Sequence, residues 1–423
     1  MREVFLHYLW RRRCFNAADL RTTEGQTLEI LHPGEYNTDA GPDFYNARVR
    51  LGETLWAGNV EMHLRASEWR AHRHAQDPAY ANVVLHVVLD EDEPALDAQG
   101  RRLPCLSLAK RVPPGLLDAY WRLEHSAGPV PCAANLLQVP EIVRLNWLDR
   151  MLVERLEQKT ALSAATLQAC GNDWEETCYR LLARTYGLKV NTEAMESLAQ
   201  SLPLRTLYRH RDQLPQMEAL LFGQSGLLPE NPDDEYPKLL AREYRHLQHK
   251  YGLQPGPLAQ WKFLRLRPAA FPTLRLAQFA ALLYHRPLLF SNLLEVERLS
   301  DLEELLAVPA SLYWHTHYHF GKTAALHTPT PGRDFIHLLL VNMLAPMLFY
   351  YGKQKHQNRY CDQALHLLDA LPAEDNKILR EWKSIGWKAG NAAQAQAMLH
   401  LYKNYCTPKR CLECAVGNRL LTS

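Results

Sequence analysis

The spacing of hydrophobic and polar residues changes along this chain. Over the first ninety residues, short stretches with helical spacing alternate with stretches typical of strands, and the remainder is mostly helical in pattern. The pattern predicts a helix over residues 3–14, strands over 27–31, 44–51, 55–64 and 82–89, and a short helix over 67–74. Helices and strands in this order predict an N-terminal α/β domain in which helices flank a mixed sheet.

The mostly helical part follows a Pro-Pro-Gly sequence at residues 113–115, which marks the first predicted domain boundary. We expect an α/β domain over residues 1–115, a helical domain over 116–400 and a cysteine-containing C-terminal segment over 401–423. Asn172 is expected to cap a helix that begins at Asp173. The most apolar stretch, 336–351, is short for a membrane span and contains a histidine, an asparagine and a proline, so a buried helix is predicted.

The composition narrows the class of protein. The 423 residues include 48 Lys+Arg and 46 Asp+Glu, a net charge of +2, which excludes a histone-like basic protein and confines any nucleic-acid surface to a local patch. A hydrophobic content of 47% excludes a largely disordered or collagenous chain. Nine scattered cysteines and an N-terminus without a secretory signal pattern predict a reduced, cytoplasmic protein without a membrane partner. The oligomeric state stays open.

Acidic and imidazole side chains gather where the second and third predicted strands would pair. Glu61 and His63 are two residues apart in the third strand, so both point to one face of the sheet. A hairpin turn at Gly52-Glu53 would bring Asp43, which precedes the second strand, close to Glu61. Two carboxylates suit Mg²⁺ or Mn²⁺, and such an ion can polarise a phosphodiester. His63 is expected to be a third ligand or a proton acceptor.

These acids also have simpler explanations. An acid beside a Gly-Pro turn, such as Asp43, is often only a solvated turn residue. Glu61 is different because it lies in an apolar strand, where burying an unpaired polar group costs roughly 2 to 7 kcal/mol. Glu61 therefore requires a partner, which could be a metal ion, an arginine or a histidine.

The order of a helix, a hairpin with an Asp, a strand with Glu-x-His, a helix and a strand resembles the PD-(D/E)XK nuclease superfamily, over roughly the first quarter of the chain. The resemblance implies that Pro42-Asp43 and Glu61 are the two acids of the motif, arranged around one or two divalent metals. It also implies that His63 stands where the family has a lysine. Either this imidazole acts as a ligand or base, or the fold is kept and the activity is lost.

Nearly the whole chain also resembles a bacterial family known only as domain of unknown function 2851. The matching stretches are GPDFYNARV, AGNVEMHLRASEW, DPAYANVVLHVV, NPDDEYPKLLAREYRHL, RPAAFPTLRLAQFA and YCTPKRCLECAVGNRLL. This resemblance implies no biochemical activity.

A basic segment follows the strand that carries Glu61. Arg70 and Arg73 are candidate phosphate contacts, and His72 is a candidate supporting residue for nucleic-acid binding. The alternative is a solvated helix end without a binding role.

His86, in the middle of an apolar strand, is expected to be a hydrogen-bonded core histidine. Glu3 and His7 share one face of the first helix, which suggests a further acid for the site.

Three cysteines near the C-terminus have the spacing of a metal site. Cys406, Cys411 and Cys414 form C-x4-C-x2-C, and in a reduced compartment such thiols favour Zn²⁺ or an iron-sulfur cluster. A fourth ligand is missing locally, and Cys361, His356 and His400 are the candidates. The alternative is a set of buried free thiols.

The sequence thus predicts a metal-dependent nuclease that acts on DNA or RNA, with Asp43 and Glu61 holding the ion and the helical domain shaping a substrate channel. A second hypothesis is a catalytically inactive nuclease fold that binds nucleic acid or a protein partner. The first hypothesis describes an enzyme and the second does not, so enzymatic activity is left open.

Overall fold

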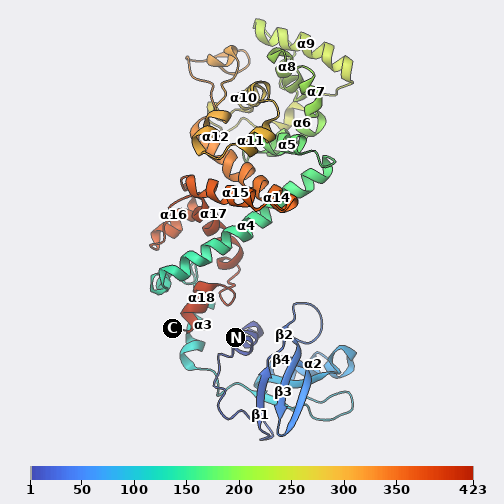
Figure 1. The fold of residues 1–423 in the computed structure, drawn as a ribbon, viewed down its shortest axis with the longest axis vertical. Coiled ribbons are helices and arrows are strands. Elements are labelled where there is room, and N and C mark those ends of the chain that lie inside the picture. Colours follow the sequence, from blue (N-terminus) through green and yellow to red (C-terminus); the bar gives the residue numbers. More distant parts are fainter. Residues whose placement is uncertain (1, 423) are drawn as a thin grey trace. The chain divides into compact units, whose positions relative to one another are not determined.

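The computed structural model describes residues 2–422. Contacts divide the chain into two compact units, of which unit 1 is Met1–Trp147 with Leu401–Ser423 and unit 2 is Leu148–His400. Unit 1 contains the sheet, and unit 2 is almost entirely helical (Figure 1). The mixed α/β N-terminal region and the mostly helical remainder predicted from the sequence are confirmed. The C-terminal segment lies in the same unit as the sheet.

Unit 1 is built around one mixed sheet. Its elements are α1 (Glu3–Arg12), β1 (Leu28–His32), β2 (Glu35–Tyr36), β3 (Phe44–Leu51), β4 (Thr54–Arg65), α2 (Glu68–Ala71), β5 (Val83–Asp90), β6 (Cys105–Ser107), α3 (Pro114–Glu124) and α18 (Ala415–Thr422), with short 3-10 helices η1 (His74–Gln76), η2 (Pro78–Tyr80) and η3 (Ala133–Gln138). The strand order is β1-β3-β4-β5-β6, with β2 added beside β3. β3 pairs antiparallel with β1 and β4, whereas β5 is parallel to β4 and β6. The parallel step from β4 to β5 explains why α2 lies between them, because parallel neighbours need a crossover.

The two faces of the β4 strand have different partners. Val60 and Met62 are fully buried and belong to the main core of unit 1, together with Phe5 and Leu9 of α1. Glu61 and His63 alternate with them and face the opposite side, where Trp69 of α2 is buried. The apolar face stabilises the sheet, and the other face holds a buried polar cluster.

Unit 2 consists of packed helices. They are α5 (Trp174–Tyr186), α6 (Thr192–Ser201), α7 (Leu204–Tyr208), α8 (Leu214–Gln224), α9 (Glu235–Tyr251), α10 (Pro272–His285), α11 (Leu289–Glu295), α12 (Leu299–Leu306), α13 (Arg333–Leu339), α14 (Ala345–Lys355), α15 (Asn358–Ala370), α16 (Lys377–Ser384) and α17 (Ala392–Leu401), with short 3-10 helices η4 (Leu258–Gln260), η5 (Pro268–Ala270) and η6 (Leu312–His315) and a small hairpin of β7 (His317–His319) and β8 (Lys322–Thr323). The long helix α4 (Glu141–Ala169) runs across the boundary between the two units, and α17 ends one residue beyond it.

The predicted cap of α5 was off by one residue. Asp173, not Asn172, is the N-cap, and its carboxylate accepts hydrogen bonds from the backbone N–H groups of Glu175 and Glu176 at 2.9 and 3.1 Å. Asn172 instead has a left-handed backbone with φ 66°. A carboxylate suits the helix start because it also interacts favourably with the helix dipole.

The most apolar part of the chain forms one continuous helical run, Arg333–Lys355, interrupted by the π-helical segment η7 (Leu340–Leu344). By length and composition alone this helix could cross a membrane, but 67% of its most apolar window is buried inside the structure, as in the core helix of a folded domain. Pro346 follows the π-helical turn. A proline lacks the backbone N–H that a regular α-helix would use at this point, which gives a physical reason for the wider turn.

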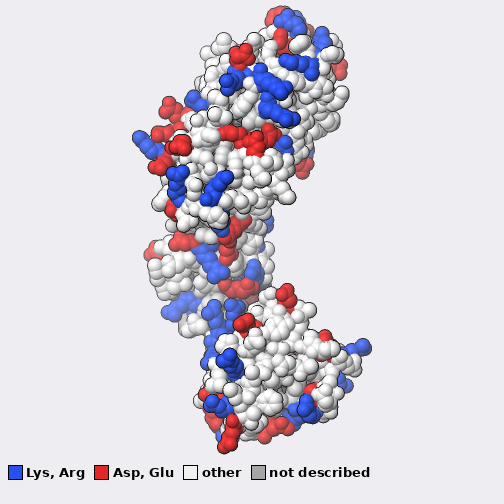
Figure 2. Space-filling model, turned by 45° about the vertical axis from the view of Figure 1, so that its right-hand side comes forward, with Lys and Arg blue, Asp and Glu red and all other residues white. Residues whose placement is uncertain are grey.

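Basic and acidic side chains are interspersed over the molecular face that Figure 2 shows. This distribution agrees with the net charge of +2. On this face, a nucleic-acid partner would therefore be held by local contacts.

Candidate metal centre

The structure brings Asp43 and Glu61 together at the start of β3. Phe44 pairs with Val60, so the residue before β3 lies beside Glu61 of β4. The Asp43 backbone N–H donates to Glu61 Oε2 at 3.1 Å, and the Met62 backbone N–H donates to Asp43 Oδ2 at 2.9 Å. Each acid therefore holds the backbone of the other strand, which fixes both side chains in place.

Glu61 and His63 face three more histidines. His63 is 1% exposed, and its Nδ1 lies 2.9 Å from Nε2 of His86 on β5. Its Nε2 lies 3.3 Å from Nδ1 of His72, which follows α2. His74, in η1, places Nε2 3.4 Å from Glu61 Oε1, and His63 Nε2 lies 3.6 Å from the same oxygen. Four imidazoles and one carboxylate thus form one connected polar cluster.

Three of these histidines have the spacing of metal ligands. His63, His72 and His74 each offer a ring nitrogen, and these nitrogens all lie within 4.8 Å of one another. His74 Nε2 is buried and has no hydrogen-bond partner among the described residues. His63 and His74 are buried and His72 is exposed, so the group opens to solvent at His72.

A second group of donors adjoins the first at Asp43. Glu3 and His7 of α1 and Asp43 each offer one donor atom, and these three atoms also lie within 4.8 Å of one another. His7 Nε2 lies 3.3 Å from Asp43 Oδ2, and the other ring nitrogen of His7 lies 3.4 Å from the Tyr36 hydroxyl. Glu3 and His7 are four residues apart on one helix, so α1 presents both to the sheet edge.

Burial determines the charge of the cluster. Burial, and then the nearby Asp43 carboxylate, raise the pKa of Glu61 to about 9. Burial, and then the neighbouring His86 and His74 rings, lower the pKa of His63 to about 2. Burial followed by the His74 ring lowers the pKa of His86 to about 4. These imidazoles are therefore neutral at pH 7, the form in which a ring nitrogen binds a metal ion.

The predicted nucleic-acid contacts lie at different places relative to the cluster. His72 is part of the histidine group. Arg70 is exposed and forms a two-pronged ion pair with Glu93, at 2.8 and 3.0 Å. Arg73 is exposed and has a left-handed backbone, φ 62°, between His72 and His74. This turn is what allows both neighbouring histidines to join one cluster.

Sequence reasoning treated His86 as a separate core residue. It is fully buried, as expected, but its ring is hydrogen-bonded to His63 and its Nδ1 has no partner among the described residues. His86 is the β5 residue that pairs with Glu61 in the parallel register, and this pairing brings its ring to His63. The alternation along β5 predicts this position only once β4 and β5 are known to pair.

The C-terminal thiols lie in unit 1. Cys406 and Cys414 are buried and Cys411 is half-buried. The candidate fourth ligands, His356, Cys361 and His400, all belong to unit 2. Sequence reasoning did not consider Cys132, which belongs to unit 1 and packs against the same core as Cys411.

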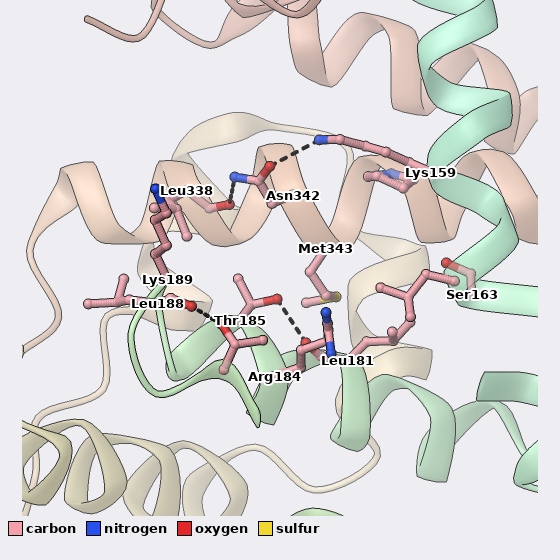
Figure 3. A pocket seen from close by; sticks show the side chains of 13 residues that line it. Lys159, Ser163, Leu181, Arg184, Thr185, Leu188, Lys189, Leu338, Asn342 and Met343 are labelled. Carbon is pink, nitrogen blue, oxygen red and sulfur yellow. Dashed lines mark hydrogen bonds between the residues drawn. The ribbon is translucent and has the colours of Figure 1, made fainter. Parts of the chain in front are cut away.

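Unit 2 contains a separate cavity of about 380 Å³ that no sequence motif indicated. Figure 3 shows Lys159, Arg184 and Lys189 around it, among apolar side chains. Lys159 Nζ donates to Asn342 Oδ1 at 3.0 Å, from the π-helical segment, and to Gln396 Oε1 at 3.1 Å. Burial lowers the pKa of Lys159 to about 7. The cavity combines positive charge with an apolar wall.

Comparison with known proteins gives a family but no activity. The family model described as "Protein of unknown function (DUF2851)" matches residues 3–377. No curated protein and no solved structure matches the chain.

Proposed function

Because the chain belongs to the DUF2851 family, whose description assigns no function, we propose from its own donor groups that unit 1 is a metal-dependent hydrolase of phosphodiester bonds in nucleic acid. The main observation is that unit 1 contains two sets of metal-binding donors, His63/His72/His74 and Glu3/His7/Asp43. Asp43 links the second set to β4, because it accepts a hydrogen bond from the Met62 backbone, next to His63. Glu61 joins them, because its carboxylate contacts both the histidines and the Asp43 backbone.

The two donor sets suit different ions. Three imidazoles beside a carboxyl group, which would give up its proton to a bound cation, are typical of a site for Zn²⁺, Mn²⁺ or Fe²⁺. Two carboxylates with one imidazole suit a harder ion such as Mn²⁺ or Mg²⁺. Mn²⁺ fits both sets, so it is the ion we propose first. The Mg²⁺ expected from the sequence fits the Asp43 set better than the histidine set.

Each residue of the site has a proposed role in hydrolysis. Divalent ions held here would polarise a phosphoryl oxygen and lower the pKa of the attacking water. Asp43 and Glu61 would hold and orient them, since the hydrogen bonds to the Met62 and Asp43 backbones already fix both carboxylates. His86 would position the His63 ring by occupying its Nδ1. His72, the exposed member of the histidine set, would complete the metal ligands on the solvent side.

The layout supports the resemblance to PD-(D/E)XK nucleases at several positions. An acid before one strand, an acid inside the next and a first helix that lends another acid correspond to Asp43, Glu61 and Glu3. The departure is His63, which is buried and neutral where the family has a lysine. We therefore assign His63 as a ligand and not as a cationic group. Arg70 and Arg73, which are both exposed and within two residues of His72 in the sequence, are the proposed phosphate contacts. Arg70 would exchange its Glu93 partner for phosphate.

The test is hydrolysis by the purified full chain. Single-stranded DNA, duplex DNA and RNA are incubated with Mn²⁺, Mg²⁺ or Zn²⁺, and then with a chelator. We expect metal-dependent cleavage that Asp43→Asn and Glu61→Gln each reduce by about 100-fold or more. Glu29→Gln is the matched control, because Glu29 is an exposed acid of the same sheet that pairs with Arg50; it should retain full activity.

Cleavage that survives both Asp43→Asn and Glu61→Gln would refute the proposal. So would a folded, metal-loaded protein that binds nucleic acid and cleaves none of the three substrates. That last result would instead favour the inactive binding module.

A further inference from the structure

The C-terminal cysteines gain a fourth neighbour in the fold. Cys132, which directly precedes η3, belongs to the same unit as Cys406, Cys411 and Cys414 and is packed with Cys411 against the core. Burial, followed by the nearby Cys414 and Cys411, raises the pKa of the Cys132 thiol to about 12. Cys406 and Cys414 are buried, and Cys132 and Cys411 are half-buried. Burial, and then the nearby Cys132, Cys414 and Cys411 thiols, also raise the pKa of Cys406. Two segments far apart in the sequence thus bring four largely buried thiols into one region of unit 1.

Hydrogen bonds join the loop that carries Cys406 and Cys411 to the segment that precedes Cys132. Lys409, in the loop between Cys406 and Cys411, donates to the backbone carbonyls of Glu124 and Ser126 at 2.6 and 3.2 Å. This bond fastens the cysteine loop to the connection that leads to Cys132. The loop begins with the π-helical turn η8 (Tyr402–Cys406) and reverses at Lys409, which has a left-handed backbone.

The loop is also held closely around the cysteines. A side chain at position 417 would place a Cβ 2.2 Å from the Cys411 carbonyl oxygen, so this close approach requires glycine. The Asn418 side chain donates to the carbonyl groups of Leu412 and Cys414 at 2.8 and 2.9 Å. These contacts fix the backbone that carries Cys411 and Cys414.

We propose that Cys132, Cys406, Cys411 and Cys414 form a four-cysteine site that holds an iron-sulfur cluster. The spacing of the sulfur atoms favours a cluster over a single zinc ion. Tetrahedral Zn²⁺ at about 2.3 Å from each sulfur holds the sulfurs about 3.8 Å apart. Within residues 2–422, no three of these sulfurs lie mutually within 4.8 Å, unlike the donors of the histidine and acid groups. A cluster, whose iron and sulfide atoms stand between the thiolates, spans the wider spacing.

The cluster would join the C-terminal segment to the sheet-bearing unit. Its ligands come from the segment after α3 and from the loop before α18, and α18 contributes Leu421 to the unit 1 core. The site is separate in residues from the histidine and acid groups. The inference is therefore independent of the proposed hydrolase activity.

The full chain, purified without oxygen, tests the proposal. We expect brown protein with iron and acid-labile sulfide in equal amounts and with visible charge-transfer absorption. Cys132→Ser should lose most of the iron. Cys361→Ser is the matched control, because Cys361 was also a candidate ligand but lies in unit 2 with its thiol donating to the Phe349 carbonyl; it should keep the wild-type content.

A second measurement covers the case in which Cys132→Ser fails to fold. Native wild-type protein is alkylated before and after removal of iron with a chelator, and the modified cysteines are identified by mass spectrometry. We expect the four ligands to become reactive only after iron is removed, with no such change at Cys361. Stoichiometric zinc without iron, iron that is unaffected by Cys132→Ser, or a Cys132 that is alkylated equally before and after chelation would each overturn the proposal.

Discussion

Glu218 offers a test of the electrostatics of the helical unit. This carboxyl lies on α8, is fully buried, and contacts the Ser311 hydroxyl at 3.0 and 3.3 Å. Burial raises its pKa from 4.5 to about 8. The folded chain therefore keeps a proton on Glu218 at pH values where the unfolded chain has lost it. As pH rises from 4.5 to 8, stability falls, and above 8 the whole cost is present.

The size of the effect follows from the two pKa values. The difference between 4.5 and about 8, at about 1.4 kcal/mol for each pKa unit, gives an upper limit of about 5 kcal/mol. Glu218→Gln has nearly the same shape as the protonated acid and cannot ionise. We expect it to match the wild type at pH 4.5 and to be more stable by about 2 to 5 kcal/mol at pH 8.5.

The assay is denaturant unfolding of both proteins at the two pH values, in which the free energy of unfolding is measured from the loss of helical signal. Glu193→Gln, at an exposed acid of α6, is the control and should change little at either pH. A Glu218→Gln protein that is equally destabilised at pH 4.5 and 8.5 would show that the carboxyl is not held protonated by burial.

Two further predictions concern stability and one concerns the cavity. Gly417→Ala should lower stability by about 1 to 3 kcal/mol in thermal unfolding, because its Cβ would meet the Cys411 carbonyl, whereas Gly115→Ala, where a Cβ meets no atom within 4 Å, should be tolerated. Asp173→Ala should cost about 1 kcal/mol through loss of the α5 cap and Asp173→Asn much less; equal losses would argue against the cap. Lys159→Met should raise the melting temperature at pH 6 more than at pH 10. Below its pKa of about 7, Lys159 is charged while buried, which lowers stability, and this loss of stability disappears as the pH approaches 10.5. An equal rise in melting temperature at both pH values would contradict this reasoning.

Local pattern was enough to predict part of the site. The alternation along β4 places Glu61 and His63 on one face, and a hairpin register places Asp43 beside them. The helical spacing of Glu3 and His7 likewise indicated that α1 presents both on one side. Each of these inferences needs only the period of one element and one turn.

The rest of the site depends on the tertiary fold. His72 and His74 join His63 because the chain reverses at Arg73, whose left-handed backbone is uncommon for an arginine and left no mark in the sequence. His86 requires knowledge that β5 lies parallel to β4. Cys132 is far from the C-x4-C-x2-C pattern in sequence, and only the return of the C-terminal segment to unit 1 brings it near.

The most direct test of the proposed metal centre is anomalous X-ray scattering from crystals of the chain grown with Mn²⁺. We expect a strong manganese peak within ligand distance of His63, His72 and His74, and a second beside Glu3, His7 and Asp43. Both peaks should persist in Glu29→Gln, and Glu61→Gln should weaken the first. Crystals saturated with Mn²⁺ that show no peak at either group would contradict a metal centre at these residues.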